Sequence, residues 1–314
     1  MFTSLLALGI TSGAIHRIAL PSGKVDLLTS KAGAFPDGIV VRDGEVFWTT
    51  MGMPTVREGA VGEAALDYSA RTGGVHALSL ESGQLREVTA PGVLTTGKQL
   101  ADDGAGRLYW GDREGCRISS VRMDGTDFQD LVINTPDEAG LAQCVGVAVD
   151  PEAGYLYWTQ KGPAKGGQGR IFRAGLTIPD GQSAQNRDDI EVLWDSLPEP
   201  IDLEIHDGWL YWTDRGAEPL GNTLNRAPIP APGAQGTAPQ ILAEGFKEAI
   251  GLALDAEAGL VYVADLNGSL WEAAIPKDGQ ATPARPRRLA DLGAPLSGIA
   301  GLSTTTTPIS RSQS

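Results

Sequence analysis

The sequence predicts an all-β chain folded as a six-bladed β-propeller, a ring of four-stranded sheets. The first observation behind this prediction is a repeated phrase of two aromatic residues, a small residue, and then Asp or another polar residue. It recurs as Phe47-Trp48-Thr49-Thr50, Tyr109-Trp110-Gly111-Asp112, Tyr157-Trp158-Thr159-Gln160, Tyr211-Trp212-Thr213-Asp214 and, in degraded form, Tyr262-Val263-Ala264-Asp265. Successive copies are roughly 50 to 60 residues apart, a spacing that suits one blade per copy.

The second observation is a set of short strands around each copy. A first strand of Gly, alternating apolar residues and Asp comes before the aromatic strand, as in residues 146–150 and 251–255. A third strand follows at residues 15–20, 75–80, 118–123, 171–176, 224–229 and 270–275, and a fourth at 25–28, 85–88, 131–133, 190–193, 241–242 and near Leu289. Period-2 alternation between regularly spaced turn residues is typical of all-β folds.

The third observation is that the two ends of the repeat pattern complement each other. The pattern starts with an equivalent of the aromatic strand, Ser4 to Gly9, and a further first strand, Gly298 to Leu302, lies near its far end. We predict that residues 298–302 pair with the N-terminal blade, because closing the ring leaves no unpaired sheet edge. Residues 1–302 then form a single domain, and the Ser/Thr-rich residues 303–314 are expected to be a disordered tail.

The repeated phrase resembles the YWTD propeller family, the class B repeat of the LDL receptor. The segment Leu108 to Ile118, followed by Met123-Asp124-Gly125, is similar to such a repeat throughout, and the resemblance covers residues 4 to 302. It implies that Trp110, Trp158 and Trp212 hold the blades together. The chain departs from the family pattern at Thr50, Gln160 and Val263, and it lacks the cysteine-rich modules that accompany the receptor propellers.

Composition excludes several classes of partner. The formal net charge of -14 disfavours nucleic acid and anionic membranes as partners.

No stretch is long and apolar enough for a membrane span, and Met1 to Ile10 lacks the basic start and cleavage site of a signal peptide. The two cysteines, Cys116 and Cys144, fall on different strands of adjacent blades, with no zinc-site spacing. No cofactor or metal is predicted, since the chain carries neither a P-loop nor a dinucleotide fingerprint in context.

Candidate site residues occur where the innermost strands begin. Four blades have Gly there, at positions 38, 146, 251 and 298, whereas Lys98 and Asp202 stand at the place we take as equivalent. Gln99 follows Lys98, and Glu204 replaces an apolar residue. Charges near the propeller axis are costly unless they are paired. Two interpretations stay open: a polar site at the channel mouth, or a Lys98–Asp202 or Lys98–Glu204 ion pair that plugs the channel.

A second candidate set lies in the loops above the axis. The longest excursion, residues 51–73, is either a binding loop or a loop packed on its own blade. The members proposed to contact a substrate are Phe35, Asp37, Met51, Met53, Tyr68, Lys161, Glu199 and Arg215. Arg113, Lys161 and Arg215 lie in equivalent loops of three blades, and Asp37, Glu199 and Glu248 come just before inner strands. Taken singly, the cations Arg113, Lys161 and Arg215 would be ordinary solvated turn residues. Together they suit an anionic or carbonyl-rich ligand.

Three functions remain open. One is a receptor-type module that binds a protein or peptide. Another is a metal-dependent lactonase-like hydrolase, for which Asp202 and Glu204 form the one nearby carboxylate pair. The third follows from a resemblance in overall layout, a lone propeller with Tyr109-Trp110, Tyr157-Trp158 and Tyr211-Trp212, to the fungal hetero-Diels–Alderases of tropolone-sesquiterpenoid pathways.

We favour the cofactor-free enzyme, whose substrate would be a small hydrophobic or carbonyl-bearing molecule. A cycloaddition needs an apolar pocket that orients two partners, and a hydrogen-bond donor on the carbonyl oxygen. Lys98, Gln99 or Arg113 would be that donor. Met51, Met53 and Phe35 would form the apolar wall, and Asp202 or Glu199 would be the acid/base group if the quinone methide forms in place.

Overall fold

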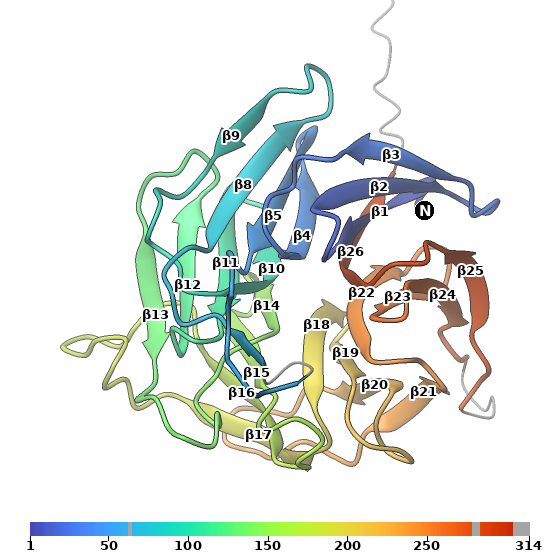
Figure 1. Cartoon of the computed structure of the whole chain (residues 1–314). Coiled ribbons are helices and arrows are strands. Elements are labelled where there is room, and N and C mark those ends of the chain that lie inside the picture. Colours follow the sequence, from blue (N-terminus) through green and yellow to red (C-terminus); the bar gives the residue numbers. More distant parts are fainter. Residues whose placement is uncertain (62–64, 278–282, 304–314) are drawn as a thin grey trace, which may run out of the picture.

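The computed structural model describes residues 1–61, 65–277 and 283–303, and these form six four-stranded antiparallel sheets around a central axis (Figure 1). The six-bladed propeller predicted from the sequence is therefore confirmed. The expected disorder after residue 302 concerns residues that, apart from Ser303, lie outside the described part of the chain.

Five of the six blades run outward from the axis in chain order. The blades are β4 (Pro36–Arg42), β5 (Glu45–Thr50), β8 (Gly74–Ser79) and β9 (Leu85–Glu87); β10 (Gly97–Asp102), β11 (Arg107–Asp112), β12 (Arg117–Arg122) and β13 (Gln129–Ile133); β14 (Val147–Asp150), β15 (Tyr155–Gln160), β16 (Gly169–Gly175) and β17 (Glu191–Leu197); β18 (Pro200–His206), β19 (Trp209–Asp214), β20 (Thr223–Pro228) and β21 (Gln240–Glu244); β22 (Ala249–Asp255), β23 (Leu260–Asp265), β24 (Ser269–Ala274) and β25 (Arg287–Asp291).

The remaining blade joins the two ends of the repeat pattern. Its innermost strand is β26 (Leu296–Leu302), which pairs antiparallel with β1 (Ser4–Gly9), followed by β2 (Ala14–Ala19) and β3 (Val25–Thr29). In Figure 1 the red β26 lies beside the dark-blue β1 and β2. The pairing begins at Leu296, two residues before the predicted start of this strand.

The Thr of the repeated phrase links neighbouring blades. In the β14–β17 blade, Thr159 Oγ1 accepts a hydrogen bond from Gly146 N (2.7 Å) and donates one to Ile201 O of the next blade (2.8 Å). Thr49 makes the same two contacts, with Gly38 N and with Lys98 O. The hydroxyl thereby satisfies backbone polar groups that burial would otherwise leave unpaired.

The Trp residues of the repeated phrase form the core between blades. Their side chains are at most 1% exposed. Tyr157 and Ile171 of one blade pack in one cluster with Leu210 and Trp212 of the next. The role in holding blades together that the family resemblance implies fits this packing.

The register of the inner strands corrects one alignment made from the sequence. Ile39, Leu100, Leu203 and Leu252 each pair with the repeat Trp or the residue that replaces it, in the order Trp48, Trp110, Trp212 and Val263. The position equivalent to Gly38 is therefore Gln99, and Lys98 aligns with Asp37. Glycine recurs at this level because neighbouring inner strands nearly touch: a Cβ on Gly146 would lie 2.0 Å from Ile201 O.

The excursion at residues 51–73 contains a small hairpin of β6 (Thr55–Val56) and β7 (Leu66–Asp67). It lies on the face that carries the loops after β1, β5, β11, β15, β19 and β23, which is the face toward the viewer in Figure 1. This face is called the upper face below.

Candidate functional site

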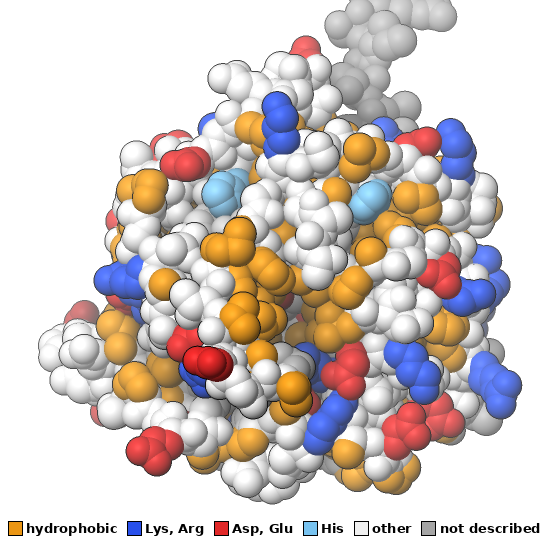
Figure 2. All heavy atoms as spheres, in the orientation of Figure 1, with side chains coloured by type: hydrophobic (Ala, Val, Ile, Leu, Met, Phe, Trp, Pro, Cys, Tyr) orange, Lys and Arg blue, Asp and Glu red, His pale blue; other side chains and the backbone are white. Residues whose placement is uncertain are grey.

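A cavity of about 250 Å³ opens at the centre of the upper face, on the propeller axis. Figure 2 shows hydrophobic side chains around a central hollow, with charged side chains gathered on one side of it. Most of its wall is built from two levels of the ring.

The upper level consists of the residue that directly follows the second strand of each blade. Because these strands all end at the same height, six side chains converge on the cavity: Ile10, Met51, Arg113, Lys161, Arg215 and Leu266. The lower level consists of residues at or just before the start of inner strands: Asp37, Lys98, Val145, Ile201 and Ile250. Phe35, Leu66 and Tyr68 contribute from loops and the hairpin.

Two of the cations share one buried carboxylate. Lys161 Nζ lies 3.1 Å and Arg215 Nε 2.7 Å from Glu199 Oε1, and the Glu199 side chain is fully buried. Burial opposes ionisation of Glu199, but Arg215 and Lys161 outweigh it and hold its pKa below the usual value. Glu199 does not line the cavity; it fixes the two cations that do.

Tyr68 brings the hairpin segment to the cavity. Its carbonyl oxygen accepts a hydrogen bond from Thr96 Oγ1 at 3.1 Å, its ring lies 5.3 Å from the Arg113 guanidinium, and Phe35 packs edge-on against it at 5.8 Å. Arg113 Nε also donates to Glu114 Oε1 at 2.8 Å. The guanidinium is therefore held in place between a ring and a carboxylate.

Lys98 forms an ion pair with Asp37, the residue at the same level of the neighbouring inner strand. Met51 Sδ lies 3.4 Å from Lys98 Nζ, and Gln99 Nε2 donates to Asp37 Oδ1 at 3.0 Å. Burial lowers the pKa of Lys98, and Asp37 opposes this shift. The Lys98–Asp202 and Lys98–Glu204 pairs considered from the sequence are not the ones formed, because the register places both carboxylates further down the axis.

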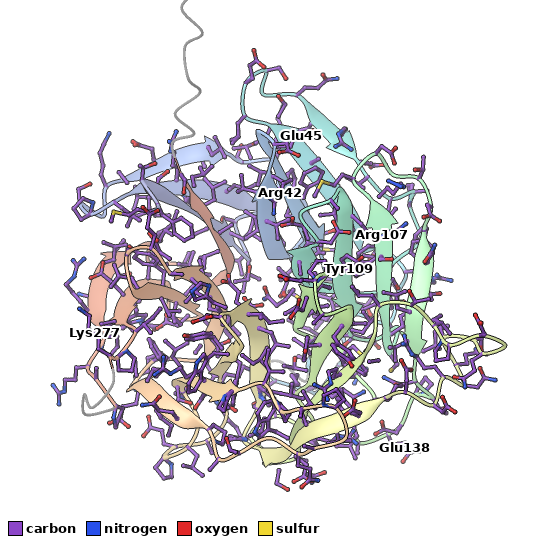
Figure 3. The ribbon with its side chains drawn as sticks, turned by 180° about the vertical axis from the view of Figure 1, so that it is seen from behind. Arg42, Glu45, Arg107, Tyr109, Glu138 and Lys277 are labelled. Carbon is purple, nitrogen blue, oxygen red and sulfur yellow. The ribbon has the colours of Figure 1, made fainter. Side chains whose placement is uncertain are left out.

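Asp202 and Glu204 belong to a second cavity of about 420 Å³, whose other lining residues include Gln99 and Arg42. Figure 3 views the molecule from this lower side, with Arg42 labelled. Asp202 accepts hydrogen bonds from Leu203 N (3.0 Å) and Leu252 N (2.9 Å). Burial raises the pKa of Asp202 to about 7 and, with the Asp202 charge beside it, that of Glu204 to about 8.

These shifts predict a pH dependence of stability. Unfolded carboxyls titrate near pH 4, so between about pH 4 and pH 8 the folded protein holds protons that the unfolded chain has released. The contribution of Asp202 and Glu204 to the free energy of unfolding should therefore fall as pH rises through this window, whereas His16 and His76, whose pKa burial lowers, contribute in the opposite sense. In the Asp202→Asn/Glu204→Gln variant, whose amide oxygens still accept from Leu252 N and Leu254 N, urea unfolding at several pH values should show a flatter profile.

The control is Asp26→Asn, which removes an exposed carboxylate and should keep the wild-type slope. A double variant with an unchanged slope would contradict the prediction.

The proposed site residues thus separate into four groups. Those that line the upper cavity are Lys98, Arg113, Phe35, Asp37, Met51, Tyr68, Lys161 and Arg215. Gln99 and Asp202 line the lower cavity, and Glu199 lies beneath the upper one. Met53 is 63% exposed and does not line either cavity. Met51 directly follows the end of β5, which holds it at the cavity, whereas Met53 lies two residues further along the loop.

Sequence reasoning found Phe35, Met51 and Tyr68 but missed the other apolar members of the wall. Ile10 and Leu266 occupy the same repeat position as Arg113, so aligning the residue after each aromatic strand would have found them. Leu66, Val145, Ile201 and Ile250 carried no such signal, since apolar residues are expected throughout a blade.

Cys116 and Cys144 are buried free thiols. No three His, Cys, Asp or Glu side chains in the described ranges gather as a metal-ligand set. Within those same ranges, no helix has the length and apolarity needed to cross a membrane.

Fold and site together define a six-bladed propeller of YWTD type with a mixed apolar and cationic cavity on its axis. The chain belongs to the propeller family that includes the low-density lipoprotein receptor-related protein 1 of Pyricularia oryzae (strain 70-15 / ATCC MYA-4617 / FGSC 8958). The two are 43% identical over 263 residues, which cover 79% of this chain and 80% of that protein. No family model matches the chain.

A second relative is the 3-hydroxyacyl-CoA dehydrogenase-like protein LAM1 of Cochliobolus heterostrophus (strain C4 / ATCC 48331 / race T), 40% identical over 253 residues. The match covers 75% of this chain and 50% of LAM1, so the chain spans about half of that relative.

Among solved structures, a chain of the nidogen/laminin complex superimposes with a TM-score of 0.67 at 19% identity, covering 96% of this chain and 98% of that one. A putative 6-phosphogluconolactonase from Bacteroides uniformis ATCC 8492 gives 0.54 at 14% identity, covering 91% and 81%. At these identities the likeness concerns the fold alone.

Proposed function

We propose that the chain is a cofactor-independent enzyme of natural-product biosynthesis that carries out an intermolecular hetero-Diels–Alder cycloaddition in the upper cavity. The partners would be a tropolone quinone methide and a terpene alkene. The observation that supports this proposal is the division of the cavity wall: hydrogen-bond donors on one side, and apolar side chains such as Ile10, Met51 and Leu266 on the other.

The reaction requires no covalent bond between the substrates and the protein. One carbon–carbon and one carbon–oxygen bond form together as the heterodiene adds across the alkene, and no proton or external electron is exchanged. The carbonyl oxygen gains negative charge on the way to becoming an ether oxygen, so a fixed donor beside it lowers the barrier. Lys98 and Arg113 would supply that donor, while the apolar wall would hold the alkene in one orientation. Gln99, proposed for this role from the sequence, lines the lower cavity and donates to Asp37 instead.

The Lys98–Asp37 pair also suits formation of the quinone methide by loss of water. Lys98 would protonate the departing hydroxyl group as its carbon–oxygen bond breaks, and Asp37 would accept the proton of the ring hydroxyl. A proton then returns from Asp37 to Lys98, and the net products are the quinone methide and water. Asp37 replaces Asp202 and Glu199 in this role because it lines the cavity and they do not.

The test is turnover of a hydroxymethyl tropolone with a sesquiterpene alkene, followed by mass spectrometry and chiral chromatography. We expect accelerated adduct formation with one stereoisomer in excess. Met51→Ala should lower kcat/KM by about tenfold or more through loss of wall contact. Met53→Ala is the matched control, since Met53 is 63% exposed. A racemic adduct formed at the rate seen without folded protein would overturn the proposal.

A second candidate is ligand or protein binding at the upper face without catalysis, which the receptor-related name of the Pyricularia relative supports. Tight binding of the tropolone with no acceleration of the adduct would favour it.

A further inference from the structure

The upper level of the cavity is divided between two kinds of residue. Going around the ring, the three neighbouring blades that contain β11, β15 and β19 contribute Arg113, Lys161 and Arg215. The three that contain β23, β1 and β5 contribute Leu266, Ile10 and Met51. All six residues occupy one repeat position, so the division is a property of this position and not of differing loop lengths.

The carboxylates that accompany the cations lie behind them. Glu199 is fully buried beneath Lys161 and Arg215, and Glu114 pairs with Arg113 from the adjacent position of the same loop. Glu248 Oε2 lies 4.0 Å from Arg215 Nε, and none of these three carboxylates lines the cavity. Among the described residues, the charged groups that line it are four cations and a single carboxylate, Asp37, which is paired with Lys98.

The charge of this cavity wall is opposite in sign to the net charge of the chain. A protein with a formal net charge of -14 would present an acidic cavity if its lining followed the average. Cations that are already oriented by carboxylates, and lie at one side of an apolar cavity, lose little further freedom when an anion binds. The partly buried setting also strengthens their attraction for it relative to water.

We infer that this cavity recognises its small molecule as an amphiphilic anion: an apolar body against Ile10, Met51 and Leu266, and one ionised oxygen group against Arg113, Lys161 and Arg215. The inference rests on the proposed function only in taking the upper cavity as the substrate site. A carboxylate and an acidic enolate such as ionised tropolone share the required chemistry, and guanidinium groups suit both. A tropolone that binds ionised has already released its ring proton, so the proton transfer to Asp37 described above applies to the un-ionised ring hydroxyl.

The test measures binding alone, by titration calorimetry near pH 7, with two pairs of probes. The first pair is 1-naphthoate and its methyl ester, and the second is tropolone and its methyl ether. We expect at least one anion to bind about tenfold or more tightly than its neutral partner. If only 1-naphthoate is preferred over its ester, the ionised group of the ligand is a carboxylate. If only tropolone is preferred over its ether, the ionised group is an enolate. Equal affinity within both pairs overturns the inference.

A variant locates the discrimination. Lys161→Met should reduce the preference for the anion severalfold, and Glu199 retains Arg215 as a partner, so the buried carboxylate is not left unpaired. Lys24→Met changes the net charge equally at a 72% exposed side chain in the turn between β2 and β3, and should leave the preference unchanged. Circular-dichroism melting checks that both variants fold. An undiminished preference in folded Lys161→Met would also overturn the inference.

Failure of this inference can be told from failure of the proposed function. Anion preference without cycloaddition would leave the recognition intact and remove the reaction. Stereoselective cycloaddition with equal affinity for the charged and neutral probes would do the reverse.

Discussion

Replacing Lys98 with Met is expected to lower both stability and activity. Stability falls because Asp37 would then be a buried carboxylate without its cation, and activity falls because the proposed hydrogen-bond donor is lost. Asp37 is 2% exposed, and in the variant its remaining side-chain partner would be the Gln99 amide. Removing one member of a buried ion pair typically costs about 3–5 kcal/mol of stability. Loss of a donor to the developing charge typically costs about 10²–10³ in kcat.

The double variant Lys98→Met/Asp37→Asn separates these two effects. The substituted amide at position 37 would be neutral and still accept from Gln99, so the free energy of unfolding should return most of the way to wild type, while activity stays low. Urea unfolding and single-turnover kinetics measure the two quantities. Full activity in a folded Lys98→Met protein would exclude Lys98 as the donor, and an equally unstable double variant would show that the pair's charge is not the cause of the loss.

The largest expected loss of stability alone comes from Trp212→Ala, at about 3–5 kcal/mol. The Trp212 ring is 1% exposed, lies 5.6 Å from the ring of Trp194 in the preceding blade, and belongs to a cluster built from both blades. Its truncation would therefore leave a cavity at a junction between blades, where neither sheet can move in to fill the space without disturbing its other neighbour.

Trp209→Ala on the same strand is the matched control. Trp209 is only partly buried and its ring lies under the Arg226 guanidinium at 4.4 Å, an interaction of about 0.5–1 kcal/mol at exposed sites. Chemical denaturation of both variants should show the Trp212 change to be severalfold more costly. Equal losses would mean that the inter-blade position of Trp212 has no special weight.

The number of blades was predictable because every blade carries its own copy of the pattern, so an error in one copy is corrected by the others. The axial residues had no such redundancy. Gln99 and Asp202 replace the glycine that marks the level, and without that marker the alignment at Lys98 slipped by one residue. A slip of one residue along a strand changes where a side chain points, and this is why Lys98 lies in the upper cavity while Gln99 lines the lower one.

The partner of Lys98 was not predictable for a different reason. Asp37 and Lys98 are 61 positions apart and meet only because neighbouring inner strands place them at the same height. From the sequence, Asp37 is expected in a loop facing the mouth, whereas the structure places it in β4, in the wall itself. The level of a residue along the propeller axis depends on how the blades are arranged in the ring, and no local sequence pattern indicates it.

The pairing of β26 with β1 also determines when the protein can finish folding during its synthesis. Until residues 296–302 leave the ribosome, β1 to β3 form a three-stranded sheet whose innermost edge is unpaired, although all six residues of β1 are buried in the finished ring. An exposed, apolar strand edge is a template for pairing with other chains. A nascent chain is therefore prone to aggregate while it still lacks β26, and pairing of β26 with β1 both completes the sheet and covers the exposed edge.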